Sequence, residues 1–287
     1  MAIELENPDH LYIIIDVNLD SWVLTGHTLG DNINAISTLV AAHILENNDN
    51  EVSIILAGPD TNRMIYTSCR PDQLIKSRLP TTSLSAPEIL QLIITTIEQR
   101  ANEMAGKELP PTSHIAAALM QVVAFAAKMK DARPALQPRC LIVSAKEPTD
   151  IESRPIINAE FVCASLDISV SVCFNNSGKV RQCPQLQHLA TFTKGVVHQP
   201  DPDVSLAGQY LVQFGQSSWT RQYMAIVSKE NAQTNAKCAR PDCPKCRNIP
   251  NNVEMNNDVC YVCSVCLSVF CSRSDKCEIC GSTFDKK

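Results

Sequence analysis

The amino-acid sequence predicts a doubly wound α/β domain followed by a small zinc-binding domain. Over the first two thirds of the 287 residues, short β-rich apolar runs alternate with amphipathic helical patterns. Nine of the fourteen cysteines lie in the last 50 residues. Alternating strands and helices are typical of βαβ units, in which helices cover both faces of a parallel sheet. With 45% hydrophobic residues, the chain can form a globular core.

Four apolar runs have the length and composition of buried strands. They are Leu11–Asp16, Val52–Ala57, Cys140–Ser144 and Ile168–Phe174. Because a helical pattern separates each run from the next, we expect the strands to form a largely parallel sheet.

The clearest helix begins after Ser85, whose hydroxyl and Glu88 form a capping box. Apolar residues then recur on one helical face at Ile89, Ile93, Ile97, Ala101 and Met104. A second helical pattern follows two prolines and carries Ile115, Leu119, Val122, Ala126 and Met129. Further helices are expected near residues 32–46, 184–192 and 203–214.

The polar segment 229–237 is interpreted as a linker between an α/β domain of residues 1–228 and a zinc domain of residues 238–287. Neither the glycine pattern of dinucleotide-binding folds nor that of P-loops occurs, so no nucleotide cofactor is expected. The N-terminus lacks the features of a secretory signal, and the longest uncharged apolar stretch, His114–Ala127, is too short to span a bilayer. We therefore expect cysteines in a reducing compartment, where thiols serve as metal ligands or small core residues.

Asp16, Asn18 and Asp20 follow one another at alternate positions where the first strand ends. This pattern is similar to the D-x-S-x-S motif of the metal-ion-dependent adhesion site in von Willebrand A domains. Both serines are replaced here. Thr112 could supply a further oxygen, but Lys146, after the third predicted strand, would repel a cation. We expect a degenerate site that binds no metal.

A phosphatase of the haloacid-dehalogenase type is the alternative interpretation of the same segment. Asp16 would be its nucleophile, and a second carboxylate two residues later would protonate the leaving group. Asn18 occupies that second position and cannot supply a proton. The six histidines show no metal-ligand spacing, and each is expected to be a surface residue or a hydrogen-bonded polar residue.

Two Cys-x-x-Cys pairs near the C-terminus predict a zinc site formed by Cys263, Cys266, Cys277 and Cys280. Four thiolates at this spacing can surround one Zn²⁺ tetrahedrally. A second zinc site could use Cys243, Cys246, Cys260 and Cys271, which leaves Cys238 unassigned. A RING-like ubiquitin-ligase module is an alternative, although this segment contains no histidine.

The partner of the zinc domain is expected to be protein. From Cys238 onward there are seven Lys and Arg residues against six Asp and Glu residues, and the whole chain has a formal net charge of −5. This balance does not favour contact with a phosphate backbone, so no direct nucleic-acid binding and no membrane binding are expected. Apolar residues around the cysteine pairs favour a protein interface.

The segment YVCSVCLSVFC (Tyr261–Cys271), followed by a C-x-x-C-G pair, closely resembles the C4 zinc finger of the smaller von Willebrand A-type subunits of TFIIH. That family also places one A-like domain before its finger. The resemblance implies a non-catalytic scaffold in the TFIIH core. It further implies pairing with the other von Willebrand A-type subunit, support of the TFIIH helicases in transcription initiation and nucleotide excision repair, and a nuclear location.

Overall fold

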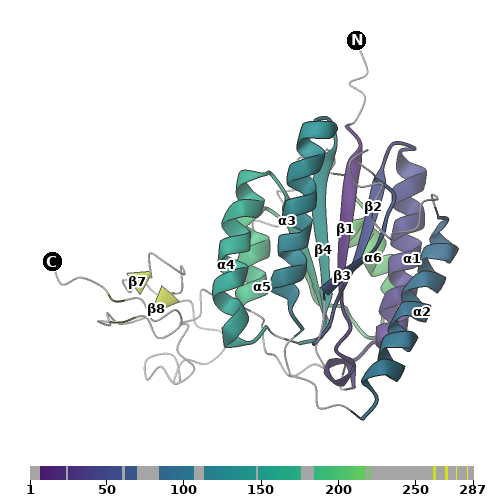
Figure 1. The fold of residues 1–287 in the computed structure, drawn as a ribbon, viewed down its shortest axis with the longest axis horizontal. Helices are drawn as coiled ribbons and strands as arrows, with labels where there is room; N and C mark the ends of the chain where they lie inside the picture. The colour runs from purple at the N-terminus through teal and green to yellow at the C-terminus, as the bar shows by residue number, and fades with distance from the viewer. Residues whose placement is uncertain are drawn as a thin grey trace. The chain divides into compact units, whose positions relative to one another are not determined.

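The computed structural model divides the chain into two compact units, Met1–Ala225 and Ile226–Lys287. It describes residues 7–23, 25–59, 62–69, 84–106, 113–146, 148–175, 184–217, 220, 261–262, 269–270, 276 and 283. The first unit is a three-layer α/β domain, in which a twisted sheet lies between two layers of helices (Figure 1).

The sheet has six strands in the order β3-β2-β1-β4-β5-β6. Its strands are β1 (Asp9–Asp16), β2 (Glu51–Ala57), β3 (Asn62–Thr67), β4 (Gln137–Ser144), β5 (Ser169–Phe174) and β6 (Val197–His198). All neighbouring pairs are parallel except β2 and β3. The chain order therefore reverses on either side of β1, which makes the carboxyl ends of β1 and β4 the topological switch point of the sheet.

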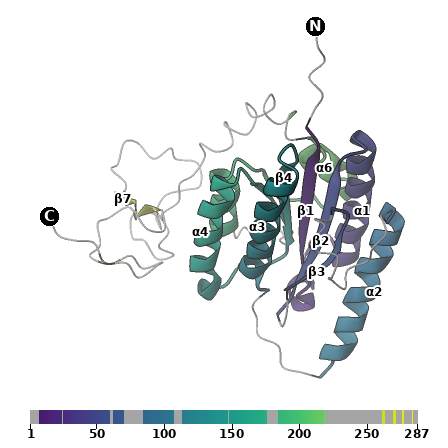
Figure 2. The same cartoon turned by 45° about the horizontal axis from the view of Figure 1, so that its top comes forward.

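Three helices cover each face of the sheet. One layer contains α1 (Leu29–Glu46), α2 (Ala86–Met104) and α6 (Leu206–Phe214). The other contains α3 (Ile115–Ala132), α4 (Asp150–Ser165) and α5 (Pro184–Phe192) (Figures 1 and 2). A short 3-10 helix, η1 (Leu19–Trp22), follows β1.

Strand β1 is buried along its whole length because both of its faces pack against helices. Ile13 and Ile15 belong to the hydrophobic cluster below α1, α2 and α6, whereas Tyr12 and Ile14 belong to the cluster below α3, α4 and α5. This two-sided burial explains why the strand is a continuous apolar run.

The predicted doubly wound α/β fold of the first domain, its four predicted strands and the five predicted helices are confirmed, whereas the zinc-binding nature of the second domain stays a prediction. The capping box of α2 is present, with the Ser85 amide donating to Glu88 Oε2 over 2.8 Å. Of the face predicted for that helix, Ile89 and Ile93 are buried, whereas its C-terminal half is only partly covered. The expectation that cysteines fill the core holds for Cys69, Cys140, Cys163 and Cys173, which are buried and free.

Helix α4 and strands β3 and β6 were not predicted from the sequence. Helix α4 contains Pro155 and has only a weak amphipathic pattern, so periodicity gives little indication of it. Strand β3 lies at the edge of the sheet, where it pairs with β2 alone and has mixed burial.

The second unit contains two short antiparallel strands, β7 (Tyr261–Val262) and β8 (Val269–Phe270), and a bridge between Lys276 and Thr283. The eight predicted zinc ligands lie outside the described residues: Cys243, Cys246, Cys260, Cys263, Cys266, Cys271, Cys277 and Cys280. Within the described part of the chain, no helix is both long and apolar enough to cross a membrane.

Candidate functional site

The candidate site lies at the carboxyl ends of β1 and β4, the two central strands of the sheet. Asp16 is the last residue of β1, and Ser144 is the last residue of β4. Both side chains are completely buried. The position agrees with the sequence-based expectation that Asp16 ends the first strand at the ligand-binding edge of an α/β sheet.

The Asp16 carboxylate is held by hydrogen bonds from three directions. The backbone amide of Asn18 donates to Oδ1 over 3.0 Å, and the hydroxyl of Ser144 donates to Oδ2 over 2.9 Å. Ser113, just before α3, contributes a third, side-chain hydrogen bond. The backbone oxygen of Asp16 accepts a further bond, 2.9 Å long, from Nε1 of Trp22 in η1. These bonds fix Asp16 as part of the interior.

Burial raises the pKa of Asp16 from 3.8 to about 6, because the charged carboxylate loses its hydration. This value already includes the hydrogen bonds from Asn18, Ser113 and Ser144, which lower the pKa, and the negative charge of Glu152, which adds to the increase. A carboxyl group in this setting is only weakly acidic and has no direct access to solvent.

Glu152 brings a second buried carboxylate to this edge of the sheet. It is in the first turn of α4, and its Oε1 accepts a hydrogen bond of 3.4 Å from the amide of Ala116 at the start of α3. Burial also raises its pKa. His114, the N-cap residue immediately before α3, has a left-handed backbone with φ of 49°. Such a conformation is strained for a residue other than glycine, and it lies directly beside Ser113.

The other predicted site residues are distributed differently. Asn18 is buried and precedes η1, whereas Asp20 points to solvent. Lys146 is partly buried, and its backbone amide donates to the Ser144 hydroxyl over 3.2 Å. Thr112 lies outside the described residues. Asp16, Asn18 and Asp20 therefore do not converge on one point as three ligands of a metal would.

Sequence reasoning missed Ser113, Ser144 and Glu152. Ser144 could have been found, because it ends a predicted strand that must neighbour Asp16 in a parallel sheet. Ser113 and Glu152 lacked such a signal, since they come from the start of α3 and from the unpredicted helix α4.

A second buried polar group joins α1, α6 and the end of β5. Asn32 and Asn175 exchange amide hydrogen bonds of 3.2 and 3.0 Å, and the hydroxyl of Tyr210 donates to Asn32 Oδ1 over 2.7 Å. All three side chains are buried. Since every bond joins different elements, this group fixes how α1 and α6 pack at this edge.

The geometry around Asp16, at the carboxyl ends of β1 and β4, favours a structural role over a catalytic one. In the described part of the chain, no group of three or more His, Cys, Asp or Glu side chains is placed to hold a metal ion. Both oxygens of Asp16 already accept hydrogen bonds, so a nucleophilic role would require the site to open.

Comparison with protein families identifies what kind of chain this is. The family model described as "Transcription factor Tfb4" matches residues 8–281, which is almost the entire sequence. The chain belongs to the Tfb4 family. The resemblance deduced from the cysteine pattern is therefore confirmed.

Two full-length relatives of this Tfb4-family chain are named as general transcription and DNA repair factor IIH subunits. The Arabidopsis thaliana protein is 22% identical over 280 residues, covering 96% of this chain and 88% of that protein. The Schizosaccharomyces pombe protein is 23% identical over 289 residues, covering 97% of this chain and 90% of that protein. A Dictyostelium discoideum protein, "General transcription factor IIH subunit 3", is 26% identical over 176 residues, which is 43% of its length.

The fold of the first unit also has a counterpart among solved structures. The N-terminal domain of TFIIH p34 superposes with a TM-score of 0.57 and 23% identity, covering 73% of this chain and 98% of that domain. The first unit of the Tfb4-family chain thus shares the fold of that domain. At the end of β1, Asp16 and Asn18 are both buried, and the backbone amide of Asn18 donates a hydrogen bond to the Asp16 carboxylate.

Proposed function

We propose that this chain is a non-catalytic structural subunit of the TFIIH core, acting in RNA polymerase II transcription initiation and nucleotide excision repair. The match of the Tfb4 family model over residues 8–281 carries this proposal. The Arabidopsis and fission-yeast relatives support it, because the match spans about nine tenths of each of them. The same membership supports a nuclear location.

The chemical environment of Asp16 at the end of β1 supports a non-catalytic role. A haloacid-dehalogenase-type phosphatase needs an accessible, ionised nucleophile and a second carboxylate as proton donor. Asp16 is buried with a raised pKa, and Asn18 occupies the second position. A RING-like ubiquitin ligase finds no support in the family match either.

We further propose that the second unit binds zinc through Cys263, Cys266, Cys277 and Cys280. Val262 pairs with Val269, so the first cysteine pair lies in the short link between two paired strands. Lys276 pairs with Thr283 in the same way on either side of the second cysteine pair. Short closed links that carry Cys-x-x-Cys are typical of structural zinc sites.

A second zinc site with Cys243, Cys246, Cys260 and Cys271 receives support from the same strand pair. Tyr261 pairs with Phe270, and Cys260 and Cys271 are their direct neighbours in the chain.

Metal analysis of the full chain, purified under reducing conditions, tests the zinc proposal. We expect at least one zinc per chain, and loss of one equivalent in Cys263→Ser and in Cys277→Ser. Cys238→Ser is the matched control, because Cys238 belongs to neither proposed ligand set, and it should keep the full zinc content. Less than one equivalent of zinc in the wild-type chain would refute the proposal.

The TFIIH assignment is tested by recovering partners of the tagged full chain from nuclear extract. We expect the other von Willebrand A-type subunit and the TFIIH helicases among the bound proteins, and no turnover of a generic phosphomonoester with Mg²⁺. We expect the α/β domain to make the contact with the other A-type subunit. Recovery of the folded chain without any TFIIH subunit would overturn the assignment.

A further inference from the structure

Exposed apolar side chains lie on two adjoining turns at the carboxyl edge of the sheet. Leu19 in η1 and Val23 just after it are 48% and 76% exposed, and Val204, just before α6, is 50% exposed. The two turns meet where Nε2 of His27 donates to the backbone oxygen of Asp201 over 3.0 Å. They lead into α1 and α6, which pack against each other. The η1–α6 surface comprises residues 19–23 and 201–204.

Both turns are held in place by side chains that are more than nine tenths buried. Trp22 anchors η1 through its bond to the backbone oxygen of Asp16. Gln209 of α6 donates from Nε2 to the backbone oxygens of Asp201 and Val204 over 2.9 and 3.0 Å, and its Oε1 accepts from the Asp201 amide over 2.8 Å. A turn that is already ordered loses little conformational entropy when a partner binds. The exposed apolar side chains are therefore presented on preformed turns.

The charge around these turns is entirely negative. Segments 1–62 and 195–220, which contain both turns together with α1 and α6, have no lysine or arginine. Asp31 caps α1, as acidic residues near helix N-termini often do. The carboxylates of Asp20 and Asp203, in contrast, are exposed and make no hydrogen bond or ion pair with another described residue. The negative charge beside the apolar side chains is therefore not compensated there.

We propose that the η1–α6 surface docks a protein segment in which lysine or arginine side chains flank aliphatic ones. The cations would meet Asp20 and Asp203, while the aliphatic side chains would cover Leu19, Val23 and Val204. Single exposed apolar residues are common on protein surfaces, but here three are grouped on two rigid turns. The same carboxylates repel nucleic acid and anionic lipid. The inference rests on the proposed function, because another TFIIH subunit would supply the segment.

Charge reversal on the full chain tests the electrostatic part. The binding partner is a TFIIH core assembled without this chain, and association is measured at several salt concentrations. For Asp20→Lys combined with Asp203→Lys, we expect the association rate constant to fall at least about tenfold at low salt, because attraction is replaced by repulsion. The rate constant of the wild-type chain should decrease as salt is added, whereas that of the variant should not.

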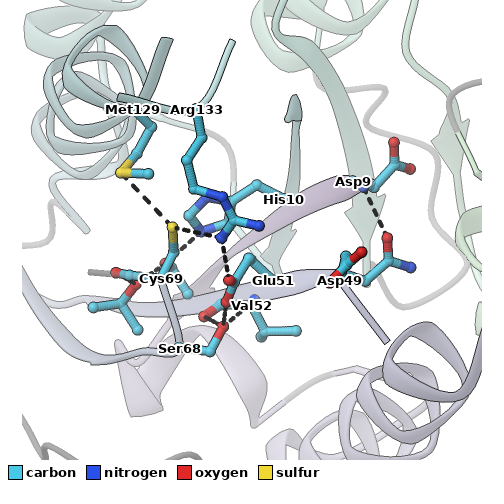
Figure 3. A network of polar contacts seen from close by, with 12 residues as sticks. Asp9, His10, Asp49, Glu51, Val52, Ser68, Cys69, Met129 and Arg133 are labelled. Atoms are coloured by element: carbon cyan, nitrogen blue, oxygen red, sulfur yellow. Dashed lines mark hydrogen bonds and ion pairs between the residues drawn. The ribbon is translucent and has the colours of Figure 1, made fainter. Parts of the chain in front are cut away.

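The matched control makes the same change in net charge at the amino edge of the sheet. Asp49 is exposed and precedes Asn50, whose side chain accepts a 2.8 Å hydrogen bond from the Asp9 amide (Figure 3). Asp131 is exposed in the last turn of α3. Asp49→Lys combined with Asp131→Lys should leave the association rate constant within about twofold of the wild-type value. An equal loss of rate in both double variants would overturn the proposal.

Serine substitutions test the apolar part. Val23→Ser and Val204→Ser should each weaken binding to the same core at least about threefold, because less apolar area is buried on docking. Ile151→Ser is the control, since Ile151 is 81% exposed on α4 in the other helical layer, and its affinity should stay unchanged. All three side chains are exposed, so the urea midpoint of each variant should equal that of the wild type.

Photocrosslinking identifies the occupant of the surface. Benzoylphenylalanine in place of Val23 or Val204 should crosslink, in the assembled core, to one segment of another subunit that carries lysine or arginine beside aliphatic residues. Crosslinks confined to residues 226–287 of this chain or to nucleic acid would overturn the docking inference. Binding that none of the surface variants weakens would do the same, while the TFIIH assignment would stand. A wild-type chain that does not join the core would overturn the TFIIH assignment and this inference together.

Discussion

Replacing Asp16 by asparagine tests whether the edge of the sheet carries a buried, weakly acidic carboxyl group. Asparagine has nearly the shape of the protonated side chain and cannot ionise. The Ser144 hydroxyl can adapt, because it lies 2.9 Å from the backbone oxygen of Lys146 and can donate there while it accepts from the new amide. We expect Asp16→Asn to fold and to be more stable than the wild type at neutral pH.

The magnitude follows from the raised pKa of Asp16. The folded chain binds the proton with a pKa of about 6, whereas the ordinary value of 3.8 applies to the unfolded chain. The contribution of Asp16 to the free energy of unfolding is therefore fully present below about pH 3.8, and it is lost as the pH rises through about 6. The full loss is about 3 kcal/mol, since one pKa unit corresponds to about 1.4 kcal/mol. About 2 kcal/mol of it falls between about pH 4.5 and pH 7.5.

Urea unfolding of the full chain, followed by the fluorescence of the buried Trp22, measures this effect. The free-energy difference between Asp16→Asn and the wild type should grow by about 2 kcal/mol between those two pH values. Asp20→Asn is the control, because Asp20 is exposed on the same segment and its replacement should change stability by less than about 0.5 kcal/mol. A difference between Asp16→Asn and the wild type that stays constant with pH would refute the reasoning.

Two further substitutions test the packing of the α/β domain by urea unfolding. A Cβ atom at Gly195 would lie 1.8 Å from the backbone oxygen of Val170, so Gly195→Ala should cost more than about 3 kcal/mol by forcing the chain away from β5. Arg139→Met removes the partner of Asp9 from an ion pair of 3.1 Å that is about 2% exposed, and should cost about 3–5 kcal/mol. The exposed Arg63→Met should change stability by less than about 0.5 kcal/mol, and a similar loss in both arginine variants would contradict this interpretation.

Local patterns in the sequence were sufficient for the fold class and most elements. Strands such as Leu11–Asp16 are continuous apolar runs because helices cover both faces of a parallel sheet. The capping box at Ser85 and Glu88 depends on residues three positions apart, so it was predicted correctly. The cysteine pattern identified the family for a similar reason, since a Cys-x-x-Cys pair is a local motif whose spacing can be read directly from the sequence.

Helices and strands that are stabilised mainly by tertiary contacts have weaker patterns in the sequence. Helix α4 contains Pro155 and is held against α3 and α5 by packing, which outweighs its poor local pattern. Strand β3 forms because β2 offers a free edge, and that pairing depends on the partner strand as much as on its own residues.

The sequence by itself determined that Asp16 ends the first strand and that its motif departs from D-x-S-x-S. Only the tertiary structure decided the chemical state of this residue. Its raised pKa and its bonds to Ser113 and Ser144 depend on side chains about 100 or more positions away, brought together by the order of the strands. The η1–α6 surface is similar, since it exists only where His27 and Asp201, 174 positions apart in the chain, meet in the folded domain. Burial and hydrogen bonding depend on what surrounds a group in three dimensions, and a linear pattern does not contain that information.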